Sequence, residues 1–147
     1  MPNIFIIIGD PNAGKSRTIR ALTGANRVTG TGYRIGTTTG EINVYVKLSA
    51  LQENNIPPRD FIRTIQQGNY QNVLVCLRRK QSNGQPDAIF YIEEFLNVGW
   101  NIKQIVVLGQ ALQNLQRNVP QPNYIPNPNQ LPSNTIASYV RQWWQWL

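Results

Sequence analysis

Eight consecutive residues near the N-terminus, Gly9 to Ser16, combine two glycines, a lysine and a serine at the spacing G-x-x-x-x-G-K-S. Because glycine has no Cβ, Gly9 and Gly14 allow the backbone to turn tightly and to approach a ligand closely. Successive N–H groups in such a turn point inward and form a nest for an anion. The adjacent lysine and serine add a positive charge for phosphate and an oxygen ligand for a divalent cation. The pattern therefore indicates a site that binds phosphate groups.

The ligand that this chemistry suits is a nucleoside triphosphate, ATP or GTP, as its Mg²⁺ complex. Lys15 is expected to bind the β- and γ-phosphates and to act in catalysis, and Ser16 is expected to bind Mg²⁺. The residues expected to contact the phosphates are those of the glycine-containing loop and the start of the following helix: Gly9, Asp10, Pro11, Asn12, Ala13, Gly14, Lys15, Ser16 and Arg17.

The elements around the motif predict an α/β fold. Residues 3–8 form a β-branched and aromatic run, typical of a strand buried on both faces, and residues 15–23 have helical spacing. Further strands are expected over 42–48, 72–77 and 102–108, further helices over 59–67, 86–98 and 111–117, and a Gly- and Thr-rich loop over 27–40. This alternation predicts three layers, with helices on both faces of a mostly parallel sheet of four strands, or five.

Three segments are expected along the chain: a nucleotide-binding domain over 1–118, an extended arm over 119–132 and a helix over 133–147. The arm contains five prolines, which fix φ and lack a backbone donor, so neither helix nor sheet is expected there. Its expected anchors are Tyr124, Ile125 and Leu131; a disordered linker is the alternative. The last helix carries Trp143 and Trp144 on an apolar stripe, which either closes the core or meets a partner.

The composition excludes several chemistries. The chain of 147 residues has no histidine, one cysteine and seven carboxylates, so it contains no Ser-His-Asp triad, no His-ligated zinc and no internal disulfide. The cysteine, Cys76, is expected to be a buried strand thiol. A net charge of +7 favours polyanions as partners. No apolar run is long enough to span a bilayer, which leads us to expect a cytoplasmic protein.

The motif and the residues after it resemble the P-loop NTPase superfamily, and within it the Era-like and tRNA-modification GTPases. The likeness rests on residues 12–16 (NAGKS), 21–24 (ALTG) and 36–38 (GTT). It implies that Thr37 or Thr38 completes the Mg²⁺ shell and senses the γ-phosphate during catalysis, with Thr38 the expected metal ligand; Thr39 is the alternative if the register slips.

Two further motifs of those GTPases are missing. Their D-x-x-G would follow the third expected strand, over 72–77, but Arg78, Arg79 and Lys80 stand there instead. Their N-K-x-D, which reads guanine, would follow the strand over 102–108, where the sequence continues Gly-Gln-Ala. No Walker B acid occurs at these places. The base therefore stays open between ATP and GTP, and Asp10, Glu41 or Asp87 remains as the acid.

The sequence thus predicts a small protein that binds a nucleoside triphosphate and hydrolyses it slowly or with a partner's help. One alternative is a small-molecule or nucleotide kinase that uses Asp87 or Glu41 as base. Another is a basic module that binds nucleotide without hydrolysis and contacts nucleic acid or protein. The expected partner surfaces are the basic cluster Arg78, Arg79 and Lys80, or the C-terminal helix with its tryptophans.

Overall fold

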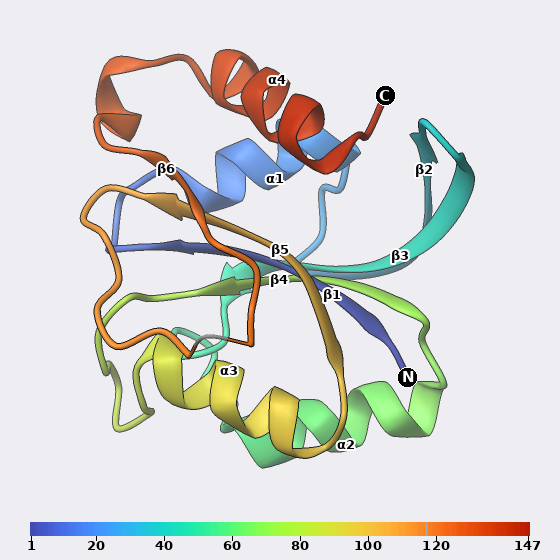
Figure 1. The fold of residues 1–147 in the computed structure, drawn as a ribbon, viewed down its shortest axis with the longest axis vertical. Coiled ribbons are helices and arrows are strands. Elements are labelled where there is room, and N and C mark those ends of the chain that lie inside the picture. The colour runs from blue at the N-terminus through green and yellow to red at the C-terminus, as the bar shows by residue number, and fades with distance from the viewer. Residues whose placement is uncertain (117) are drawn as a thin grey trace.

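A computed structural model describes residues 1–116 and 118–147 and shows a three-layer α/β fold (Figure 1). The strands are β1 (Asn3–Gly9), β2 (Thr29–Thr37), β3 (Gly40–Ala50), β4 (Asn72–Leu77), β5 (Asn101–Leu108) and β6 (Asn123–Ile125). The helices are α1 (Lys15–Thr23), α2 (Pro58–Gly68), α3 (Ala88–Asn97), the 3₁₀ helix η1 (Pro128–Gln130) and α4 (Ser133–Trp144). The expected fold class is confirmed, although the described residues form a sheet of six strands rather than four or five.

The strand order places β1 in the interior of the sheet. The order is β2-β3-β4-β1-β5-β6, with β1 parallel to both β4 and β5 and with β2 antiparallel to β3. Helices α1 and α4 cover one face of the sheet, and α2 and α3 cover the other (Figure 1). The chain leaves β1 toward one edge and later returns past it toward the other. Ligands of open α/β sheets bind where the strand order reverses in this way, at the carboxyl ends of the strands.

Strand β1 is buried on both faces, as its continuous apolar sequence predicts. Phe5 and Ile7 pack in the core under α1 and α4, whereas Ile4 and Ile6 pack in the core over α2 and α3. The neighbouring thiol of Cys76 in β4 is fully buried, as expected, and burial raises its pKa to about 12. The rigid central strands therefore hold the turn that follows β1 in a fixed position.

The prediction of a loop over residues 27–40 is wrong, because most of this segment forms the strand β2. This strand lies at the edge of the sheet and pairs with β3, from Thr29 opposite Lys47 to Thr37 opposite Gly40; its last residue also forms an isolated antiparallel bridge with Trp146. Its ladder is interrupted between Gly30 and Tyr33, where Gly32 has a φ of 71°. Few of its side chains are buried. An edge strand with glycines and little apolar surface leaves no alternating pattern to recognise.

The helix expected over residues 111–117 is also wrong for residues 111–116; residue 117 lies outside the described residues. Asn114 adopts a left-handed φ of 63°, which a continuing helix does not allow. Leu112 and Leu115 nevertheless pack against the core on the α2 and α3 face. Their spacing reflects this packing and not a helical turn.

The proline-rich arm joins the sheet, contrary to expectation. Residues Asn123 to Ile125 form β6, parallel to β5, with Leu108 opposite Ile125. The strand fits between Pro122 and Pro126, so neither proline has to donate within the ladder. Of the three expected anchors only Ile125 is buried, while Tyr124 and Leu131 are exposed.

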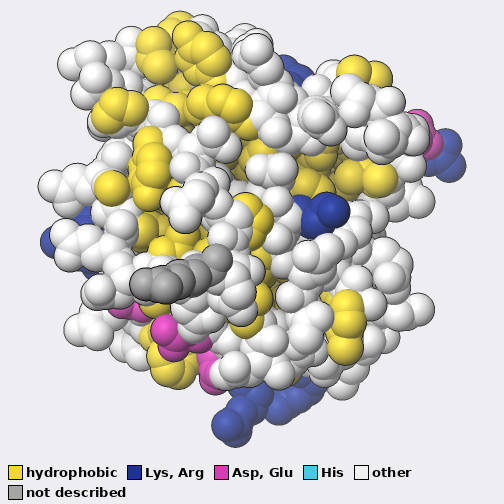
Figure 2. All heavy atoms as spheres, viewed as in Figure 1, with side chains coloured by type: hydrophobic (Ala, Val, Ile, Leu, Met, Phe, Trp, Pro, Cys, Tyr) yellow, Lys and Arg dark blue, Asp and Glu magenta, His cyan; other side chains and the backbone are white. Residues whose placement is uncertain are grey.

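The C-terminal helix α4 packs on α1 and on the sheet. Its side chains Ile136, Val140 and Trp144 are buried in the same core as Phe5, whose ring centroid lies 5.4 Å from that of Trp144. The outer side of this region is apolar in places, and Figure 2 shows hydrophobic side chains gathered over η1 and α4. In the described parts of the chain, no helix has both the length and the apolar character that a membrane crossing requires.

Candidate functional site

The turn between β1 and α1 has the backbone of an anion nest. Asn12 and Gly14 have positive φ values of 66° and 84°, and Gly14 is the N-cap of α1. No side chain caps this helix end, and no acidic residue lies in its first turn. The N-terminal N–H groups and the positive end of the helix dipole are therefore available to an anion.

The two glycines of the motif are required for different reasons. At Gly14 the left-handed φ disfavours a residue with a Cβ. At Gly9 the constraint is space, because a Cβ would lie 3.1 Å from both the Ala13 Cβ and the Leu108 carbonyl oxygen. The turn thus folds back closely over the end of β1 and against β5.

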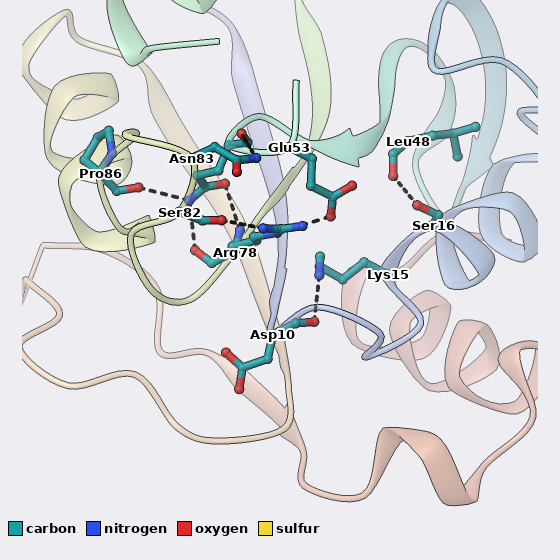
Figure 3. Close-up of polar contacts among 10 residues, drawn as sticks. Asp10, Lys15, Ser16, Leu48, Glu53, Arg78, Ser82, Asn83 and Pro86 are labelled. Carbon is teal, nitrogen blue, oxygen red and sulfur yellow. Dashed lines mark hydrogen bonds and ion pairs between the residues drawn. The ribbon is translucent and has the colours of Figure 1, made fainter. Parts of the chain in front are cut away.

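Lys15 is held inside the turn, with its ammonium at the pocket. Its side chain is buried, and Nζ donates a hydrogen bond of 2.9 Å to the carbonyl oxygen of Asp10 (Figure 3). Burial lowers the pKa of Lys15 from its ordinary value, since desolvation disfavours the charged form. An anion at the turn would satisfy this buried charge better than the single carbonyl does.

Ser16 lies beside Lys15 and is oriented by β3. Its Oγ donates a hydrogen bond of 2.7 Å to the carbonyl oxygen of Leu48 (Figure 3). A hydroxyl that donates its proton in this way keeps its lone pairs for a cation. The orientation of Ser16 is therefore compatible with the expected role as a Mg²⁺ ligand.

A pocket of about 230 Å³ lies in front of this turn, lined by Asn12, Gly14, Lys15, Ser16, Arg17 and Glu53. Glu53 is the residue that sequence reasoning missed. It follows the end of β3 by three positions, and β3 becomes the third strand of the chain once β2 is counted. The acid of the resembled GTPases was expected after the third strand, so recognition of β2 would have directed attention to Glu53.

Hydrogen bonds of the Gln52 side chain connect the segment after β3 to the segment after β4, next to the pocket. Its fully buried amide donates to the carbonyl oxygens of Arg78 and Pro86, at 3.0 and 3.1 Å, and its oxygen accepts from the Arg78 backbone N–H at 2.9 Å. The side chain of Asn83 also donates to the Gln52 carbonyl oxygen. This network fixes Glu53 and Arg78 relative to each other.

Replacement of Gln52 by alanine is expected to lower the free energy of unfolding by about 3 kcal/mol, because buried backbone groups at Arg78 and Pro86 lose their partners. Urea denaturation of Gln52→Ala and of the exposed control Gln66→Ala would measure the difference. A loss below about 1 kcal/mol for Gln52→Ala would show that water replaces the amide without penalty.

The basic residues after β4 lie beside the phosphate-binding turn. The Arg78 Nε is 3.4 Å from the Glu53 Oε1, and the Arg79 Nη2 is 3.3 Å from the Asp10 Oδ2. Both arginine side chains are largely buried, whereas Lys80 is exposed. Arg78 and Arg79 therefore belong to the site, and they are not a solvated turn.

Thr37 and Thr38 lie at the other end of the sheet. They form the tip of the β2–β3 hairpin, where the Thr37 Oγ1 donates to the Gly40 carbonyl oxygen at 2.6 Å and the Thr38 N–H donates to the Gln145 carbonyl oxygen at 3.0 Å. Since β3 is parallel to the other central strands, its start lies at the edge opposite the pocket. The structure does not bring these threonines to Lys15 and Ser16.

The other carboxylates considered from the sequence are also elsewhere. Glu41 is exposed near the same hairpin tip. Asp87 caps α3, with its side chain accepting from the Phe90 N–H at 2.9 Å. Asp10 belongs to the turn, but its carboxylate faces Arg79. Glu53 is therefore the carboxylate that lines the pocket.

The fold and the site together define a P-loop nucleotide-binding protein. The family model described as 50S ribosome-binding GTPase matches residues 4–109, which include the P-loop, strands β2 to β5 and all of β1 except its first residue. The chain belongs to this GTPase family. No curated protein sequence and no solved structure showed significant similarity to it.

Proposed function

We propose that the protein binds GTP as its Mg²⁺ complex and hydrolyses it slowly or with a partner's help. The observation that carries the proposal is the pocket in which Lys15, Ser16 and Glu53 meet at an uncapped helix N-terminus. The family supports GTP as the nucleotide. The structure alone favours any ligand with two or more linked phosphates, so ATP is the comparison that the experiment needs.

The residues present fit a magnesium ion. Ser16 offers a hydroxyl oxygen with free lone pairs, and Glu53 offers a carboxylate at the same pocket. The phosphates and water would complete the six oxygen ligands that Mg²⁺ prefers. Within the described residues no cluster of three acidic, Cys or His side chains exists, so the nucleotide has to bring part of the metal site. When bound, the ion would neutralise charge on the phosphates.

Hydrolysis at this site would be phosphoryl transfer to water. The water oxygen forms a bond to the terminal phosphorus, the bridging bond to the β-phosphate breaks, and the products are the nucleoside diphosphate and phosphate. Lys15 and the backbone N–H groups of the P-loop stabilise the charge on the transferred group. Glu53 is the group placed to orient the water and to accept its proton.

A second hollow beside the P-loop suits the nucleoside. It has a volume of about 470 Å³, and one side of it is lined by Asp10, Pro11 and Ala13, which belong to the P-loop but not to the lining of the phosphate pocket. The rest of its lining comes from the segments after β4, β5 and β6: Arg79, Lys80, Leu108, Gly109, Gln110, Pro126, Pro128 and Asn129. The amides of Gln110 and Asn129 each provide donors and acceptors for a base.

Calorimetric titration with GTP, GDP, ATP and AMP, each with Mg²⁺ and with a chelator, tests the proposal. We expect GTP with Mg²⁺ to bind at least about tenfold more tightly than ATP or the chelated nucleotide, which corresponds to about 1.4 kcal/mol. Phosphate release from saturating GTP then measures hydrolysis. No heat with any of these nucleotides would contradict nucleotide binding by this pocket.

A further inference from the structure

Arg78 is placed where the pocket meets the sheet. It directly follows β4, the strand that pairs with β1, and its backbone N–H and carbonyl are both held by Gln52. Its side chain therefore starts from a fixed point and extends to the Glu53 carboxylate, on the side of the P-loop where the Lys15 ammonium lies (Figure 3). Its guanidinium donates to two groups, the Glu53 carboxylate and the Ser82 hydroxyl.

The charges in this corner do not balance. Among the described residues around the P-loop, the cations Lys15, Arg17, Arg78 and Arg79 outnumber the two carboxylates, Glu53 and Asp10, which pair with Arg78 and Arg79. Burial is the main cause of the lowered pKa of Lys15; of its two neighbours in this ion pair, Glu53 raises that pKa and Arg78 lowers it by less. Because like charges repel in a partly buried site, an anion between Lys15 and Arg78 would be strongly favoured.

The ion pair between Arg78 and Glu53 is weak, so another anion can replace Glu53 as the partner of Arg78. The Glu53 and Arg78 side chains are 35% and 20% exposed, and the separation of 3.4 Å is long for a charge-assisted hydrogen bond. Partly exposed ion pairs of this kind contribute little to stability, because water solvates both groups when they separate. A phosphate group, with its higher charge and three oxygens, is a better partner for a guanidinium.

We propose that Arg78 binds the terminal phosphate of the nucleotide and gives up Glu53 in doing so. The inference rests on the proposed function, because it assigns a role within the same site. The exchange has two consequences. It makes the site discriminate triphosphate from diphosphate, and it releases the Glu53 carboxylate for the metal and the attacking water. Arg78 would then be a catalytic residue that this protein supplies without a partner, and the hydrogen bonds of Gln52 to its backbone hold it in position.

The test compares the affinities for GTP and GDP, both with Mg²⁺, in the wild type, Arg78→Ala and Arg78→Lys. We expect Arg78→Ala to weaken GTP binding about tenfold and to change GDP binding less than about twofold, since only GTP has the terminal phosphate. Arg78→Lys should recover part of the loss, because a lysine keeps the charge without the planar fork. Equal weakening of GTP and GDP, or no change in either, would overturn the proposal.

Two controls separate this role from a structural one. Ser82→Ala removes the second contact of the Arg78 guanidinium and should leave the ratio of the GTP and GDP affinities unchanged. Arg63→Ala removes one positive charge at an exposed position of α2 and should also leave it unchanged. A wild-type protein that binds neither nucleotide would instead contradict the proposed function and would be seen before any variant is compared.

Discussion

Replacement of Lys15 by alanine is expected to weaken the binding of GTP with Mg²⁺ by at least about 100-fold, which corresponds to about 2.7 kcal/mol. The ammonium is the buried cation of the P-loop, and the proposed function assigns it the contact with two phosphates. Calorimetry or fluorescence titration with GTP measures the loss. The fold should persist, because the substitution also removes a buried charge with a single hydrogen-bond partner.

The matched control for Lys15→Ala is Arg20→Ala. Arg20 lies on the same helix, is exposed, and its removal lowers the net charge by the same amount. If Arg20→Ala weakened GTP binding as much as Lys15→Ala, the effect would be the general attraction of a basic protein for an anion. Thermal unfolding of both variants establishes that each is folded under the conditions of the titration.

The pH dependence of binding is a second readout for Lys15. Burial lowers the pKa of Lys15 in the free protein, so its ammonium deprotonates at a lower pH than an ordinary lysine. Bound phosphates favour the protonated form, and binding above that pKa therefore requires proton uptake. The affinity for GTP should fall as the pH rises toward the alkaline range, and this fall should be absent in Lys15→Ala.

Replacement of Glu53 by glutamine is expected to slow GTP hydrolysis by about 100-fold and to weaken the binding of GTP with Mg²⁺ to a smaller extent, since glutamine offers the ion only a neutral oxygen. General-base assistance typically contributes a factor of this size, and glutamine keeps the shape of the side chain without the charge. Phosphate release at saturating GTP measures the rate, and titration measures the affinity. Stability should change little, since the ion pair with Arg78 is partly exposed.

Glu41→Gln is the matched control for Glu53→Gln. Glu41 is exposed at the far edge of the sheet, and its neutralisation changes the net charge by the same amount. It should hydrolyse GTP at the wild-type rate. Unchanged hydrolysis in Glu53→Gln would exclude Glu53 as the base. Slower hydrolysis in Glu41→Gln would instead indicate that the β2–β3 hairpin, with Thr37 and Thr38, takes part in the reaction.

Local sequence was sufficient for the elements that are buried and regular. The run from Ile4 to Ile8 can only be a strand covered on both faces, and the glycines and lysine after it define the P-loop, because these features depend on neighbouring residues alone. The same is true of the strands β4 and β5 and of the helices α2, α3 and α4. Their order along the chain was enough to establish the α/β class.

Edge elements and long-range neighbours depended on the tertiary structure. Strand β2 has few buried side chains and is stabilised by pairing with β3, and β6 exists because β5 offers an open edge beside a three-residue gap between prolines. Sequence patterns record burial, and these strands have little of it.

The phosphate-binding turn is predictable from local residues alone, since Gly9, Gly14, Lys15 and Ser16 lie within one short segment. The acid at the same pocket is not predictable in this way, because Glu53 is 37 residues away from Ser16 along the chain and reaches the pocket through the parallel pairing of β3, β4 and β1. The same pairing moves Thr38 to the opposite edge. Strand order decides which strand ends are neighbours, and strand order follows from contacts between distant residues.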